Sequence, residues 1–326
     1  MRNSKVGRAF TVLLWWTRIW GCRSLVAAAL LAAFVAGACL AEEKKPPSDL
    51  SQPFAYDSKA PLELTDKILE QDDTCEIHDV SYRSPGGGRV NAYLVVPKGK
   101  GPHAAILFGH WGNGTRAEFL PEARIYAAKG AVSLLPDYPW ERTGESRKKI
   151  NNFGKPEIDK AIYIQTIVDL RRGIDLLLSR AGTDPQRLAY VGHSYGAQWG
   201  AILAAVDARP QTAILMGGLP AMSSLLTGSS PDLLDFAEQN KGLLSHYMDV
   251  MQEFDPVRYV TGSHRAPLLF QFARYEEYFS RPEMERYFTA ATPPKEVMWY
   301  STDHALNDPR TLQDRQAWLA KHIGLK

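Results

Sequence analysis

The sequence predicts an α/β domain built on a mostly parallel, doubly wound β-sheet. Short apolar runs alternate with helical patterns through most of the chain, and strands that are apolar on both faces are typical of parallel sheets covered by helices on each side. The composition agrees, because 45% of the 326 residues are hydrophobic, 23% charged and 10% aromatic. These values exclude a disordered, collagen-like or multi-span membrane protein.

The positive charge of the chain is concentrated at its N-terminus. All five basic residues before Glu42 lie in a stretch without acidic residues. From Glu42 onward, 33 basic residues stand against 36 acidic ones, a net charge of −3, compared with +2 for the whole sequence. The basic balance therefore belongs to the leader, and the composition gives no indication of a nucleic-acid partner.

Residues 1–41 are predicted to be a signal peptide or a signal anchor. A basic region precedes the seventeen uncharged residues Leu25–Ala41, as in secretory signals. Small residues at 36–38 and 39–41 offer cleavage sites, whereas Ala-Gly-Ala-Cys ending at Cys39 resembles a lipoprotein box. A retained segment would nearly span a bilayer. We expect an extracytoplasmic protein, in the bacterial periplasm or secreted, with membrane attachment through this segment or a lipidated Cys39 as alternatives.

Residues 42–61 contain four prolines and are predicted to be a linker to a single domain at 62–326. The domain opens with a β-hairpin, in which Cys75–Tyr82 and Arg89–Pro97 flank a glycine-rich turn. Later strands are predicted at Ala104–Phe108, Ala131–Pro136, Leu188–Val191, Thr212–Met216, Pro267–Phe272 and Glu296–Tyr300. The clearest helices are predicted at Ile158–Ser179 and at about 308–322.

A long connection between two of these strands, residues 217–266, is a helical excursion. It contains leucine-rich helical stretches near 231–237 and 242–253. In doubly wound folds such an excursion usually covers the carboxyl ends of the strands, where ligands bind. It is either a small lid that shapes a pocket or an elaborated crossover helix.

Residues 192–196, Gly-His-Ser-Tyr-Gly, fit the pattern G-x-S-x-G. A buried strand is predicted directly before the motif and a helix, Ala197–Ala205, directly after it. A serine on such a sharp turn has strained backbone angles, and the flanking glycines avoid clashes there. This context favours Ser194 as a nucleophile, with helical N–H groups near its oxygen.

A serine nucleophile needs a histidine to accept its proton and a carboxylate to orient that histidine. His304 follows the last predicted strand, so it is expected at the carboxyl edge of the sheet, and the adjacent His193 is expected to point elsewhere. Glu276 follows the preceding strand and is the expected acid, with Glu277 as a close competitor. The order serine, acid, histidine is that of α/β-hydrolases.

The sequence resembles the dienelactone-hydrolase-like group of α/β-hydrolases, neighbours of prolyl-oligopeptidase-type peptidases and acetyl-xylan-type esterases. The resemblance covers the chain from the first hairpin to the final helix. Five motifs carry it: 107–114, 136–138, the elbow at Ser194, Asp255-Pro256 and Asp303-His304. Glu276 departs from the aspartate most common in that family. The resemblance implies an oxyanion hole made by the backbone N–H of Tyr195 and that of Trp111 or Gly112.

These observations favour a serine hydrolase that cleaves small-molecule carboxylic esters through an acyl-enzyme on Ser194. Two alternatives stay open. A prolyl-oligopeptidase-type peptidase would use the same residues, but such relatives carry a large N-terminal propeller, and only about thirty residues separate the leader from the hairpin here. The other alternative is a catalytically inert binding protein on the same fold. No metal or cofactor is expected, because Cys75 is the domain's single cysteine and no Cys/His cluster is present.

Overall fold

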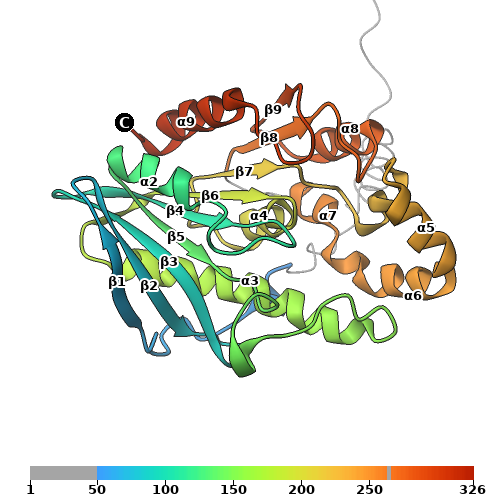
Figure 1. The fold of residues 1–326 in the computed structure, drawn as a ribbon, viewed down its shortest axis with the longest axis horizontal. Coiled ribbons are helices and arrows are strands. Elements are labelled where there is room, and N and C mark those ends of the chain that lie inside the picture. Colours follow the sequence, from blue (N-terminus) through green and yellow to red (C-terminus); the bar gives the residue numbers. More distant parts are fainter. Residues whose placement is uncertain (1–49, 263–265) are drawn as a thin grey trace, which may run out of the picture. The chain divides into compact units, whose positions relative to one another are not determined.

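The computed structural model describes residues 50–262 and 266–326, in which a nine-stranded β-sheet forms the centre of the fold (Figure 1). The predicted signal segment, Cys39 and His264 lie outside these residues. The strands are β1 (Thr65–Gln71), β2 (Cys75–Arg83), β3 (Arg89–Pro97), β4 (His103–Gly109), β5 (Ala131–Pro136), β6 (Thr183–His193), β7 (Thr212–Met216), β8 (Leu268–Ala273) and β9 (Lys295–Tyr300).

The strand order is β1-β2-β3-β5-β4-β6-β7-β8-β9. β1, β2, β3 and β5 pair antiparallel, and from β5 to β9 every neighbouring pair is parallel. The predicted fold, a mostly parallel sheet with an N-terminal hairpin, is therefore confirmed. All carboxyl ends of the parallel strands meet at one edge, which is where the loops after β4, β6, β8 and β9 come together.

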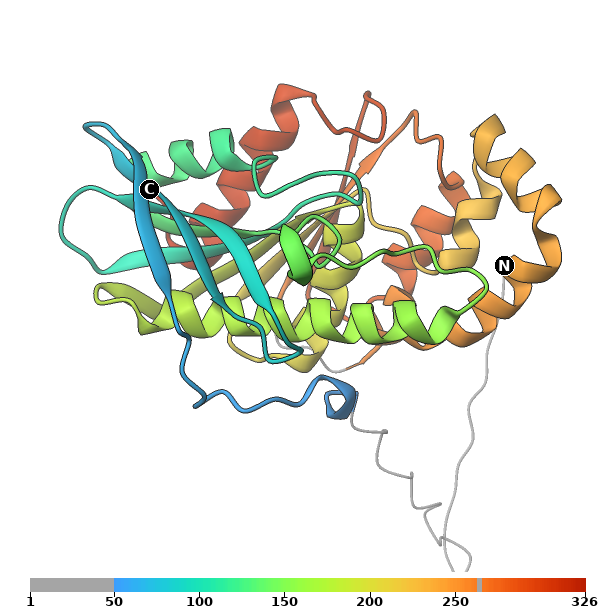
Figure 2. The same ribbon diagram turned by 60° about the horizontal axis from the view of Figure 1, so that its bottom comes forward.

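Helices cover both faces of the sheet (Figure 2). The helices are α2 (Leu120–Ala128), α3 (Pro156–Ser179), α4 (Tyr195–Val206), α5 (Pro231–Gln239), α6 (Lys241–Met251), α7 (Pro256–Val260), α8 (Arg281–Ala290) and α9 (Pro309–Ile323). Short 3-10 turns lie at η1 (Gln52–Phe54), η2 (Gly144–Ser146), η3 (Met222–Thr227) and η4 (Gln252–Phe254).

Alternate side chains of the central strands supply the two halves of the core. In β4, Ala105 and Leu107 pack into the layer that holds α3 and α4, while Ile106 and Phe108 pack into the layer that holds α2 and α9. All four are at most 1% exposed. Burying a leucine or phenylalanine side chain stabilises a fold by about 1.5–3 kcal/mol. This two-sided burial explains why β4 reads as a continuous apolar run.

Some elements carry too little sequence signal to be predicted, β1 and α8 among them. All seven side chains of β1 are exposed, so it has no apolar alternation and is held by its ladder with β2. The predicted boundaries of leader and linker stay predictions. Within the described part of the linker, Phe54 is fully buried, and its carbonyl accepts a hydrogen bond from Arg171 of α3 at 2.7 Å.

The excursion between β7 and β8 forms η3, α5, α6, η4 and α7. α5 and α6 lie beyond the carboxyl ends of the strands (Figure 1), whereas α7 packs against α4. The Tyr247 hydroxyl of α6 donates to the buried carboxylate of Asp159 in α3 at 2.7 Å, which ties α6 to the main domain. No side chain of α5 is fully buried. Among residues 50–262 and 266–326, no helix combines the length and apolarity needed to cross a bilayer.

Candidate active site

Ser194 occupies the sharp turn between β6 and α4 with a positive φ of 56°, which non-glycine residues rarely adopt. A backbone strained in this way costs about 1–3 kcal/mol and persists only when its surroundings hold it. Here the Ser194 N–H donates to the Met216 carbonyl of β7 at 2.7 Å. The Tyr190 hydroxyl donates to the Gly196 carbonyl at 2.8 Å and supports the other side of the turn.

The two glycines of the motif are required by close backbone approach. A Cβ on Gly192 would collide with the Gly196 carbonyl, and a Cβ on Gly196 would collide with the Gly109 carbonyl at the end of β4. Any side chain at either position would therefore push the helix away from the sheet. The strand–turn–helix context predicted for the motif is the one observed.

The structure brings Ser194, His304 and Glu276 together. His304 follows β9, and its Nε2 lies 2.9 Å from the Ser194 Oγ. Its Nδ1 lies 2.7 Å from the Glu276 Oε2. The Glu276 side chain, just after β8, is 1% exposed, and its other oxygen accepts the Tyr278 N–H at 3.0 Å. The Tyr278 ring packs edge-on against the imidazole, 4.8 Å between centroids.

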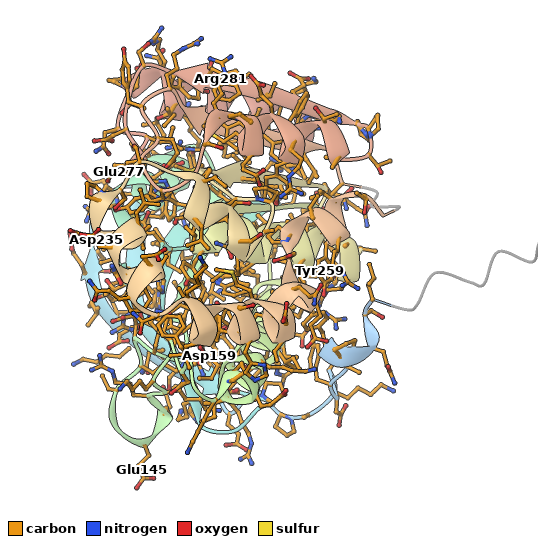
Figure 3. All side chains as sticks on the ribbon, turned by 90° about the vertical axis from the view of Figure 1, so that its right-hand side faces the viewer. Glu145, Asp159, Asp235, Tyr259, Glu277 and Arg281 are labelled. Carbon is orange, nitrogen blue, oxygen red and sulfur yellow. The ribbon has the colours of Figure 1, made fainter. Side chains whose placement is uncertain are left out.

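Glu277, the competing candidate for the acid, points elsewhere. Its side chain is exposed and lies at the edge of the molecule in Figure 3. Its backbone carbonyl accepts hydrogen bonds from the N–H groups of Ser229 and Ser230. Glu277 therefore helps to hold the excursion in place and does not orient His304.

No protein-family model matches this sequence, and no curated protein sequence matches it significantly. Solved structures do match. The acetyl xylan esterase from Paenibacillus sp. R4 superposes with a TM-score of 0.67 at 19% identity, over 84% of this chain and 91% of that chain. The chain has the α/β-hydrolase fold. The predicted resemblance is thus confirmed for the fold.

Two further solved structures also superpose on this chain. Acetyl xylan esterase 1 from Thermoanaerobacterium sp. JW/SL YS485 has a TM-score of 0.69 at 14% identity and covers 84% of this chain and 93% of that chain. A prolyl endopeptidase structure has a TM-score of 0.59 at 16% identity and covers 80% of this chain but 40% of the peptidase. This chain therefore corresponds to nearly the whole esterase and to less than half of the peptidase.

The backbone N–H groups predicted to form the oxyanion hole differ in whether they already have a hydrogen-bond acceptor. The Tyr195 N–H belongs to the first turn of α4, where backbone N–H groups have no helical acceptor. The Trp111 N–H donates to the Glu118 Oε2 at 2.7 Å. Within the described residues the Gly112 N–H has no acceptor, and the Gly112 carbonyl accepts the Trp140 indole N–H at 2.8 Å. Of the two loop residues, Gly112 is thus the one with an available donor.

Glu118 is a site residue that sequence reasoning missed. Besides the Trp111 N–H, it binds the Nδ1 of His193 at 2.7 Å, and the Nε2 of His193 lies 2.9 Å from the His304 carbonyl. Because a carbonyl only accepts, the His193 Nε2–H donates this second hydrogen bond. Both nitrogens of His193 are thus engaged, so it cannot accept the Ser194 proton. Nothing in the local sequence marks Glu118, because its partner His193 lies 75 residues away along the chain.

His110 is held neutral in the loop after β4. Its Nδ1 donates to the Trp111 carbonyl at 2.6 Å, and its Nε2 accepts the Tyr138 N–H at 3.3 Å. Burial lowers the pKa of His110 to about 4, partly opposed by the hydrogen bond to Trp111. Protonation would place two donors against each other at Nε2. The loop next to Ser194 therefore depends on a neutral imidazole.

We expect His110 to lower the free energy of unfolding as the pH drops from about 6.5 toward 4, so that wild type loses more stability, or gains less, than a variant without this imidazole. The pKa of His110 is lower in the folded state than in the unfolded state, so in this window the unfolded chain binds a proton that the folded chain does not, at about 1.4 kcal/mol per pH unit. Denaturant titrations at pH 7 and pH 5 measure this slope. Burial raises the pKa of Asp137 to about 6 and gives an opposite slope below pH 6. His110→Gln is therefore the control, and equal slopes in both proteins would contradict the prediction.

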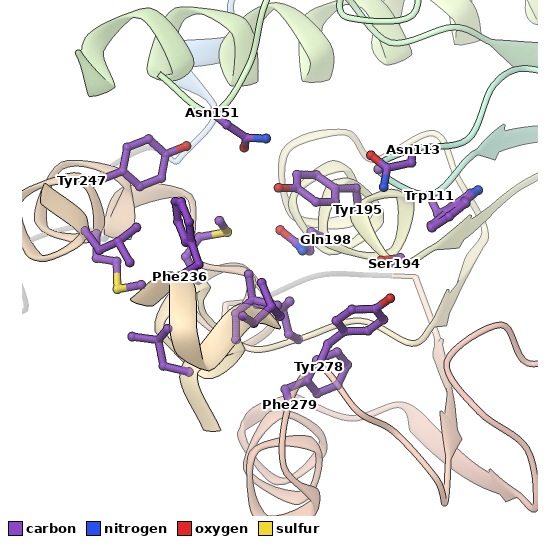
Figure 4. Close-up of a pocket in the computed structure, with 18 of the residues that line it drawn as sticks. Trp111, Asn113, Asn151, Ser194, Tyr195, Gln198, Phe236, Tyr247, Tyr278 and Phe279 are labelled. Atoms are coloured by element: carbon purple, nitrogen blue, oxygen red, sulfur yellow. The ribbon is translucent and has the colours of Figure 1, made fainter. Parts of the chain in front are cut away.

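Ser194 and His304 line a pocket of about 290 Å³ that continues toward α5 and α6 (Figure 4). Its wall is mostly apolar, and the excursion supplies much of it, including Leu219, Met222, Leu233, Phe236, Leu244 and Met248. Of the two predicted roles for residues 217–266, the structure therefore supports a lid that shapes a pocket. Among the described residues, no three His, Cys, Asp or Glu side chains form a group that could hold a metal ion.

Proposed function

We propose that this protein is a serine hydrolase that cleaves carboxylic esters. The observation that carries the proposal is the pair of hydrogen bonds linking Ser194, His304 and Glu276, at 2.9 and 2.7 Å, on a strained elbow that opens into a pocket. A serine hydroxyl is unreactive near neutral pH unless a base accepts its proton, and a carboxylate that orients the base stabilises the imidazolium formed.

In the proposed reaction, the Ser194 Oγ attacks the ester carbonyl while His304 Nε2 accepts the hydroxyl proton. The oxyanion of the tetrahedral intermediate receives the N–H groups of Tyr195 and Gly112, and losing one such donor typically costs about 2.7–4 kcal/mol. His304 then protonates the departing alcohol, which leaves an acyl group on Ser194. Water, deprotonated by His304, attacks this acyl-enzyme. The bond from the acyl carbon to the Ser194 Oγ then breaks, His304 returns the proton to that oxygen, and the acid is released.

We propose esters rather than peptides as substrates because the chain covers very different shares of the esterase and peptidase structures that it matches. It covers 91% of an acetyl xylan esterase and 40% of a prolyl endopeptidase. An inert binding protein is disfavoured because the hydrogen-bonded chain from Ser194 through His304 to Glu276 is complete. The basic and then apolar pattern of residues 1–41 supports action outside the cytoplasm, which stays a prediction.

A fluorophosphonate probe tests the proposal without a substrate. We expect the probe to label the full chain at Ser194, as mapped by mass spectrometry of the modified peptide, because only an activated serine reacts. Labelling should disappear in His304→Ala and persist in His246→Ala, a matched control in which the histidine is exposed on α6. A folded protein that takes no label, or that still takes it in His304→Ala, would contradict the proposed mechanism.

A further inference from the structure

The pocket beside Ser194 has two parts of different chemistry. Its far part is enclosed by apolar side chains of α5 and α6, with Phe153 packed 5.3 Å from Phe236 and 5.0 Å from Tyr247 between ring centroids. Its near part, next to the serine, contains the amide of Gln198. We propose that this pocket holds the acyl group of the substrate, and that this acyl group is large and apolar and carries a hydrogen-bond acceptor that faces Gln198. The assignment rests on the esterase function proposed above.

Gln198 supplies the reason to expect an acceptor in the ligand. It lies one helical turn after Ser194 in α4 and is 2% exposed. Within the described residues its side-chain Nε2 has no hydrogen-bond partner. Buried polar groups are nearly always satisfied, and leaving one unpaired costs more than the hydrogen bond contributes when it forms. The Gln198 side chain lines the pocket, so rotation of its amide would bring the Nε2 to a carbonyl, ether or hydroxyl oxygen of an occupant.

The positions of Ser194 and His304 indicate which half of the ester enters the pocket. The acyl group stays bonded to Ser194, which lines the pocket, while the alcohol leaves with the proton from His304. A second hollow, of about 380 Å³, shares His304 and Trp111 with the first pocket and adds Asn307, but Ser194 does not line it. The alcohol thus has space on the histidine side. The apolar pocket is left for the acyl group.

The first test is a series of p-nitrophenyl esters from acetate to octanoate, with kcat/KM measured for each. Each methylene that enters the apolar part should raise kcat/KM about fourfold until the pocket is filled. Leu233→Trp, which places a larger side chain in the pocket, should lower the ratio of octanoate to acetate about tenfold or more. Leu234→Trp is the matched control, because Leu234 is the next residue of α5, is 42% exposed and does not line the pocket.

The second test addresses the acceptor. p-Nitrophenyl heptanoates with an oxo group at carbon 4, 5 or 6 are compared with unsubstituted heptanoate. At least one keto ester should have a higher kcat/KM than its hydrophobicity, compared with that of heptanoate, predicts. Gln198→Leu should lower the kcat/KM of this keto ester about tenfold relative to that of heptanoate. Thermal melting of each variant shows whether it is folded.

Several outcomes would overturn the inference. A flat acyl series, equal effects of Leu233→Trp and Leu234→Trp, or selectivity that follows the alcohol in a series of acetate esters would each remove the acyl assignment. No effect of Gln198→Leu on any keto ester would remove the acceptor. In these cases acetate hydrolysis and labelling of Ser194 would still support the serine hydrolase. If no ester is cleaved and Ser194 takes no fluorophosphonate label, the proposed function falls and the acyl assignment falls with it.

Discussion

Ser194→Ala is expected to abolish ester hydrolysis, with kcat reduced about 10⁶-fold, because no other described group near His304 can form the acyl-enzyme. His193 cannot substitute, since both of its ring nitrogens are engaged by Glu118 and the His304 carbonyl. The fold should be retained. The variant loses one hydrogen bond to His304, worth about 0.5–1.5 kcal/mol. Initial rates with p-nitrophenyl acetate and a thermal melt measure the two effects.

Ser194→Gly separates chemistry from backbone strain. Both variants lack the hydroxyl, but only glycine adopts the φ of 56° at position 194 without steric cost. We therefore expect Ser194→Gly to be equally inactive and about 1 kcal/mol more stable than Ser194→Ala. Turnover retained in either variant would refute a serine mechanism, whereas a less stable Ser194→Gly would refute the strain argument alone.

The second large effect is expected from Glu276→Gln, which should lower kcat about 10⁴-fold. The carboxylate holds His304 Nδ1–H at 2.7 Å and is almost completely buried, so its negative charge faces the imidazolium with little screening. An amide of the same size removes the charge and no longer selects the tautomer in which Nε2 accepts the serine proton. Steady-state kinetics with p-nitrophenyl acetate, with a melt to check folding, provide the measurement.

Glu277→Gln is the matched control for this prediction. It makes the same chemical change one residue along, on an exposed side chain that does not reach His304. We expect kcat within about twofold of wild type, as for most exposed substitutions. A larger loss from Glu277→Gln than from Glu276→Gln would move the acid by one residue.

Local sequence was enough to predict the elbow, because its causes are local. A buried strand, two glycines and a helix of small residues surround Ser194 within about a dozen positions, and the positive φ follows from that turn. His304 and Glu276 could be placed because parallel strands end at one edge, so residues that follow β8 and β9 meet residues that follow β6. The choice between Glu276 and Glu277 required side-chain direction, which differs between neighbours and has no sequence signature in a loop.

Tertiary structure alone decided the remaining features. Glu118 joins Trp111 and His193 across the sheet edge, and the exposed strand β1 is held by backbone hydrogen bonds that any side chains permit. The role of the excursion likewise depended on where α5 and α6 lie, since the same leucines could have covered a crossover. Apolar periodicity and turn-forming residues depend on positions close together in the sequence, so the structures they form can be predicted from it. Contacts between loops distant in sequence depend on distances that only the folded sheet sets.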